Sequence, residues 1–236
     1  MTKAKKSKNL NFNQKMDCEV TKKILKASRS AFELYYEMSD GECWVKQTPE
    51  YWYTTSIAKT LHRHYKKYYN KLEKSAYVLL ENSVSDIRSH SNTTKRGRPH
   101  HDLRSAGRAD ISIWIEEPDQ WWYPVSVIEV KTRGESVSTF KADVNRIKRL
   151  LREAGKKSGL GTVENGYYVV ITDIGNVSDK RSAKTKLKAR HNKLHAKIQQ
   201  HVGKGITVGS NFKLCGYKKD ETSRAAIFVF KFEIKN

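Results

Sequence analysis

The chain has few cysteines and prolines, no long apolar run, and a shortage of acidic residues. Its three cysteines, Cys18, Cys43 and Cys215, are scattered through 236 residues without a Cys-x-x-Cys spacing. That scatter argues against a disulfide framework and a structural zinc site, and favours a reducing, cytoplasmic location. No apolar run approaches the roughly 20 residues needed to cross a bilayer, and no segment has the pattern of a signal peptide. We therefore expect no membrane partner.

The shortage of acid leaves a strongly basic chain, with 46 Lys and Arg against 25 Asp and Glu and a formal net charge of +21. Such a charge attracts polyanions through counterion release and long-range steering. The basic residues are also clustered: nine lie between Lys180 and Lys204 without an acid, and six between Arg88 and Arg108. We expect DNA or RNA as the partner; a solvated surface, an anionic membrane and ribosomal RNA are the alternatives.

Hydrophobic spacing indicates one α/β domain behind a short tail. Residues 1–15 are lysine-rich and polar, which predicts a flexible basic arm. Residues 16–236 are expected to form a single domain. Apolar periodicity predicts helices over about 21–38, 50–69, 140–154 and 180–202, a hairpin over 107–131, and strands at 167–172 and 225–234.

Thr48-Pro49-Glu50 has the chemistry of a helix start. A hydroxyl suits the cap position, proline tolerates the first turn, and an acid there is favoured by the helix dipole.

The segment from Ser89 to Gly107 is rich in Gly, Pro, Ser, Asn and basic residues, with no apolar period. It predicts a long loop, and long loops in compact domains are often functional. We expect the loop to border a substrate groove; an ordinary insertion is the alternative. Guanidinium groups match phosphate oxygens well, so the expected phosphate contacts are Arg96, Arg98, Arg104 and Arg108, together with Lys184 and Lys188 of the basic helix.

The hairpin carries the most informative pattern. Asp110 opens the run Ile111 to Ile115, and Glu129-Val130-Lys131 closes the run that starts at Val125. Because side chains alternate along a strand, Glu129 and Lys131 share one face. Two carboxylates and an ammonium are then expected to converge, which suits metal-assisted hydrolysis of a phosphodiester. The alternative is a turn acid beside an ordinary Glu/Lys pair.

These residues resemble the PD-(D/E)XK nuclease superfamily, in which Asp110 would be the first acid and Glu129-Val130-Lys131 the second half-motif. Ala109 departs from the pattern because the family has proline there. The resemblance implies a restriction-endonuclease-like αβββαβ core over about 50–175, with a central mixed β-sheet flanked by helices. It also implies Mg²⁺, or Mn²⁺ in its place, bound by Asp110, Glu129 and the main chain of Val130.

The same resemblance implies an extra carboxylate on the helix before the sheet. Glu50 is the candidate, with a purely structural, dipole-compensating role as its alternative, and Glu81 is the rival. The implied activity is that of a Mg²⁺-dependent DNA endonuclease of a restriction, phage or defence type, with a homodimer if both strands are cut. A non-catalytic nucleic-acid-binding protein on the same fold, or an RNA-directed nuclease, stays open. Asp119 of the literal Pro118-Asp119 pair is expected only to cap the hairpin turn.

Overall fold

The computed structural model describes residues 12–42, 44–91, 107–119, 121–133, 136–158, 161–174, 180–216 and 224–235. In chain order its elements are α1 (Phe12–Met38), α2 (Glu50–Tyr69), β1 (Ser75–Ser83), α3 (Val84–His90), β2 (Arg108–Glu116), β3 (Trp122–Thr132), α4 (Val137–Ala154), β4 (Asn165–Ile174), α5 (Lys180–Val202), β5 (Ile206–Gly216) and β6 (Arg224–Ile234). Two short 3₁₀ turns cover Asn70–Leu72 and Lys156–Ser158.

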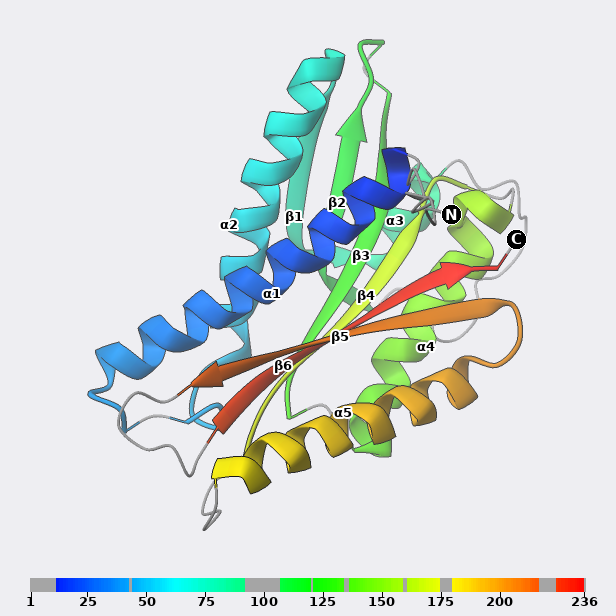
Figure 1. Cartoon of the computed structure of the whole chain (residues 1–236). Helices are drawn as coiled ribbons and strands as arrows, with labels where there is room; N and C mark the ends of the chain where they lie inside the picture. Colours follow the sequence, from blue (N-terminus) through cyan, green and yellow to red (C-terminus); the bar gives the residue numbers. More distant parts are fainter. Residues whose placement is uncertain are drawn as a thin grey trace, which may run out of the picture.

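The strands form one six-stranded mixed sheet in the order β1-β2-β3-β4-β6-β5. β1, β2 and β3 form an antiparallel meander, and α4 then connects β3 to the parallel strand β4. β4 and β5 both pair antiparallel with β6. The fold is thus α/β, as predicted, and the crossover brings the end of β3 next to α4 (Figure 1).

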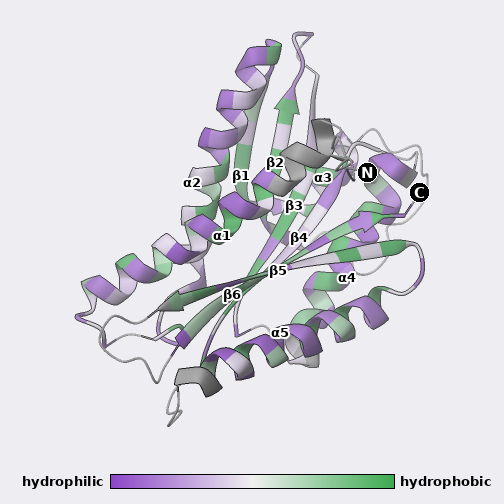
Figure 2. Ribbon diagram, viewed as in Figure 1, coloured by the Kyte–Doolittle hydropathy of each residue, from purple (hydrophilic) through white to green (hydrophobic). Residues whose placement is uncertain are grey.

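Helices cover both faces of the sheet. Buried residues of α1 and α2 pack on one face, against side chains such as Ile113, Val130 and Val169. Residues of α3, α4 and α5 pack on the other face, against Val127, Val170 and Phe230. Figure 2 shows many green, hydrophobic residues in the strands and an alternation of purple and green residues along the helices. Burial on both faces explains the continuous apolar sequence of β4.

The predicted elements around the hairpin are confirmed. β2 and β3 pair directly, and Ser136 begins α4 by accepting a hydrogen bond from the backbone N–H of Thr139. α5 has the predicted bounds, and β6 lies where the alternating phenylalanines indicated a strand. No helix in the described part of the chain is both long and apolar enough to cross a membrane.

Three elements were not predicted: β1, α3 and β5. α1 also begins at Phe12, inside the segment expected to be a flexible arm, and residues 1–11 lie outside the described residues. The predicted cap of α2 was wrong. Pro49 occupies the N-cap position, and the hydroxyl of Thr48 instead donates to the carbonyl of Trp44 at 3.1 Å.

Candidate functional site

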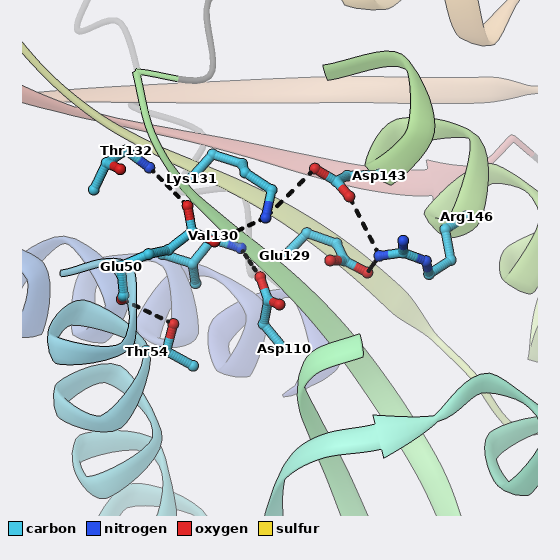
Figure 3. Close-up of polar contacts among 9 residues, drawn as sticks. All are labelled: Glu50, Thr54, Asp110, Glu129, Val130, Lys131, Thr132, Asp143 and Arg146. Atoms are coloured by element: carbon cyan, nitrogen blue, oxygen red, sulfur yellow. Dashed lines mark hydrogen bonds and ion pairs between the residues drawn. The ribbon is translucent and has the colours of Figure 1, made fainter. Parts of the chain in front are cut away.

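The hairpin brings Asp110, Glu129 and Lys131 together, as the sequence predicted. Asp110 lies near the start of β2, and the other two lie near the end of the adjacent strand β3. Figure 3 shows their headgroups in one space between the end of β3 and α4. Val130 points to the opposite, α2-covered face, where it is fully buried.

Asp110 is fixed by the backbone of the neighbouring strand. Its Oδ2 accepts a hydrogen bond of 2.7 Å from the N–H of Val130. Burial raises the pKa of Asp110 to about 6, although that hydrogen bond and the charge of Lys131 act in the opposite direction. The carboxylate is therefore ionised at neutral pH in an environment that disfavours its charge.

Glu129 is the most buried acid of the site, with 1% of its surface exposed. Its Oε1 accepts a hydrogen bond of 2.6 Å from Nη1 of Arg146 on α4. Its Oε2 is buried and has no hydrogen-bond partner among the described residues. Burial raises the pKa of Glu129 well above its ordinary value, while Arg146 favours the charged form. A buried carboxylate oxygen left without a donor is costly, and a cation would relieve that cost.

Lys131 connects the hairpin to two helices. Its Nζ lies 2.8 Å from Oε1 of Glu50 on α2 and 3.9 Å from Oδ2 of Asp143 on α4. Burial disfavours the ammonium, but the hydrogen bond to Glu50 and the charges of Asp143 and Asp110 outweigh it and raise the pKa of Lys131. Lys131 is therefore a permanent cation at neutral pH and has no free lone pair to act as a base.

Glu50 does more than compensate the dipole of its own helix. Besides the ion pair with Lys131, its Oε2 accepts a hydrogen bond of 3.1 Å from the backbone N–H of Thr132. The first residue of α2 thus holds the end of β3 through two contacts. The rival acid, Glu81 in β1, has an exposed side chain and a φ of 52°, and it forms no hydrogen bond or ion pair with the described residues of this site.

Sequence reasoning missed two members of the site, Asp143 and Arg146. Arg146 lies 3.3 Å from Oδ1 of Asp143, so it bridges Asp143 and Glu129. Burial raises the pKa of Asp143 despite its two cationic neighbours. A signal was available, because Asp143 and Arg146 are polar residues three apart that directly precede the apolar positions Val144 and Ile147. Polar residues beside an apolar stripe mark the boundary of the buried helix face.

The other predicted residues do not join this cluster. Arg108 is exposed at the start of β2, and Lys184 and Lys188 are exposed on α5. Arg96, Arg98 and Arg104 lie outside the described residues. Asp119 caps the hairpin turn as predicted, since its Oδ1 accepts a hydrogen bond of 3.3 Å from the N–H of Trp121. That turn joins the end of β2 to the start of β3, whereas Glu129 lies near the end of β3.

The donor set suits a hard divalent cation. Mg²⁺ is usually bound by one or two protein carboxylates, with waters and substrate phosphates completing its shell. Asp110 and Glu129 provide such a pair, and the unpartnered Oε2 of Glu129 is an oxygen ready to accept a cation. As they stand, no three His, Cys, Asp or Glu side chains among the described residues are arranged to hold a metal ion.

Comparison of the chain with protein-family models, with curated proteins and with solved structures gives no match.

Proposed function

We propose that this protein is a Mg²⁺-dependent endonuclease that hydrolyses phosphodiester bonds in DNA, built on a restriction-endonuclease-like core. The proposal depends most on one observation: Asp110, Glu129 and Lys131 meet around a buried carboxylate oxygen of Glu129 that has no hydrogen-bond partner among the described residues. The order α2-β1-α3-β2-β3-α4-β4 supports it, because it follows the αβββαβ succession that the resemblance implies, with the short helix α3 inserted between β1 and β2.

Each residue of the site has a distinct task in this proposal. Asp110 and Glu129 hold the ion. Bound there, Mg²⁺ supplies a coordinated water of lowered pKa and charge stabilisation at the phosphoryl group. Lys131 orients the attacking water and neutralises the developing negative charge, because it remains protonated. Glu50 positions Lys131 through their 2.8 Å contact.

Arg146 stabilises the buried carboxylate of Glu129 when no metal ion is bound. Its guanidinium partly neutralises Glu129, so the buried carboxylate has one stabilising partner before a divalent cation arrives. Asp143 keeps that guanidinium in place from one turn earlier in α4.

DNA is proposed as the substrate because the net charge of +21 favours a polyanion and the chemistry suits a phosphodiester. A duplex cut on both strands needs two such sites, since each site cleaves one strand. We therefore propose a homodimer for double-strand cleavage.

Plasmid cleavage tests the catalytic assignment. The purified protein should nick or linearise supercoiled plasmid in Mg²⁺ and not in EDTA. K131A should bind DNA with wild-type affinity in EDTA, because it removes one of many positive charges. It should nevertheless lose cleavage, because Lys131 provides the ammonium that stands beside Asp110 and Glu129. D110A should also abolish cleavage, whereas D119A, at the far turn of the same hairpin, should not. Full activity of K131A or D110A would refute the assignment.

One observation favours a second candidate, a nucleic-acid-binding protein without catalysis. Lys131 and Arg146 already neutralise the carboxylates of the site, so the fold satisfies most of its charges internally. This candidate predicts salt-sensitive binding of DNA with no Mg²⁺-dependent product. Running the assay with plasmid, single-stranded DNA and RNA separates it from a DNA nuclease and from an RNA-directed nuclease.

A further inference from the structure

A second concentration of positive charge lies away from the hairpin, in a groove between α1 and α2. The groove has a volume of about 540 Å³. Its cationic lining comes from both helices: Lys23 and Lys26 of α1, and Lys59, Arg63 and Lys67 of α2. Residues four apart share one face of a helix, so the three cations of α2 form a stripe facing the two of α1.

The charge of this groove is only partly compensated locally, by the electrostatic interaction of Lys23 with Glu19, whose ion pair is with Lys22. None of the described residues lining it is acidic, and none of its five cations takes part in an ion pair within the described part of the chain. The nearby ion pairs, Lys22 with Glu19 and Arg29 with Glu33, use other cations of α1. Like charges held in one concavity repel each other, so the arrangement is best satisfied by an external anion.

The neutral lining indicates which part of a nucleic acid the groove fits. It contains small or polar side chains such as Ala27, Ser30 and Thr60, and among its described lining residues there is no Phe, Tyr or Trp. Sites for single strands usually offer aromatic rings on which bases stack, whereas phosphate contacts need only cations and small donors. The groove therefore suits the sugar-phosphate backbone of a duplex.

We propose that the α1–α2 groove binds the backbone of duplex DNA beside the phosphate that is cut, independently of base sequence. The identity of the polyanion rests on the proposed function; the groove itself does not. The same helix connects the two places, because α2 begins at Glu50 in the candidate site. At a rise of 1.5 Å per residue, the stripe runs from about 14 Å to about 25 Å along α2 from Glu50, less than one turn of DNA.

Duplex binding in EDTA, where no cleavage occurs, tests this surface. K59Q/K67Q removes two lysines of the groove, and K66Q/K71Q is the matched control, because both of its lysines are exposed and neither lines the groove. Fluorescence anisotropy would be measured on two duplexes of unrelated sequence and on one single strand over a salt series. K59Q/K67Q should weaken binding to both duplexes equally, by at least about tenfold at about 100 mM salt, and should lower the salt slope by about 2. The control should match the wild type.

Three results would overturn the proposal: an equal loss in both double variants, no loss in K59Q/K67Q, or a loss confined to single-stranded DNA. Circular dichroism melting of both variants verifies that each is folded. The nuclease proposal is judged separately, by cleavage in Mg²⁺. If the wild type does not cleave DNA but K59Q/K67Q binds duplex more weakly than the wild type, the groove proposal stands and the nuclease proposal fails. If the wild type cleaves DNA and K59Q/K67Q binds duplex as well as the wild type, only the groove proposal fails.

Discussion

At the scale of single residues, the site holds two carboxylates whose charged forms are destabilised by burial. Asp110 and Glu129 both have raised pKa values because burial disfavours their charged forms. Glu129 is stabilised at one oxygen by Arg146, and Asp110 by one backbone N–H. Sites of this kind commonly lower the stability of a protein in exchange for function.

Replacing Asp110 by Asn should stabilise the metal-free protein at pH 7.5. The ordinary pKa of an aspartate, 3.8, rises to about 6 here, so above pH 6 the folded state carries a charge that it disfavours. D110N removes that charge and its side-chain oxygen can still accept the hydrogen bond from Val130. We expect a gain on the order of 1–3 kcal/mol, measured by urea unfolding in EDTA.

The sign of the pH dependence follows from the same shift. As the pH falls from 7 towards 4, the folded wild type takes up the proton before the unfolded chain does, so the contribution of Asp110 becomes more favourable. The advantage of D110N should therefore shrink as the pH approaches 4. Mg²⁺ should stabilise the wild type more than D110N. A D110N protein less stable than the wild type at pH 7.5 would contradict the assigned shift.

Removing Arg146 should have the opposite effect on stability. R146Q leaves the carboxylate of Glu129 buried without its cation, which costs about 3–5 kcal/mol for a pair of this type. Urea unfolding at pH 8 in EDTA measures the loss. The double variant R146Q/E129Q should recover most of it, because the buried charge is then absent. Equal stabilities of the single and double variants would show that the ion pair does not determine the loss.

At the scale of elements, the sequence predicted the helices and strands that have a clear local hydrophobic period. The hairpin, α2 and α5 each have a clear period, and so Asp110, Glu129 and Lys131 could be placed on adjacent strands. α3 has seven residues and β5 contains polar and glycine positions, so neither has a strong period. Glu50 could be proposed but not assigned, because its contact with Lys131 joins residues 81 positions apart.

Asp143 and Arg146 were missed for a tertiary reason. Their function depends on how closely α4 approaches the sheet, and no local pattern records that distance. Gly166 in β4 determines it in part: a Cβ there would lie 2.2 Å from Cγ2 of Ile147, the residue after Arg146. The glycine thus permits the close packing that brings Arg146 to Glu129.

G166A should consequently disturb both the fold and the site. The added methyl group must displace α4, which should cost about 1–3 kcal/mol in the free energy of unfolding and reduce Mg²⁺-dependent cleavage. G209A in β5 is the matched control, because a Cβ there meets nothing within 4 Å. Its stability should stay within about 0.5 kcal/mol of the wild type. If the two variants unfold alike, the close approach of α4 is not needed.

At the scale of the whole molecule, the net charge of +21 should make salt act in opposite directions on folding and on binding. Self-repulsion opposes the compact state, and dissolved ions screen it, so the free energy of unfolding in urea should rise between about 50 and 300 mM NaCl. The affinity for DNA in EDTA should fall steeply over the same range, because each neutralised phosphate contributes about 0.9 to the salt slope. The control is sodium sulfate at the same ionic strength as the NaCl. If sulfate binds specifically, it should raise the free energy of unfolding more than NaCl does. If the free energy of unfolding stays constant or falls as NaCl is added, the basic surfaces are already neutralised within the fold. The proposed binding of a polyanion to these surfaces would then lack its electrostatic basis.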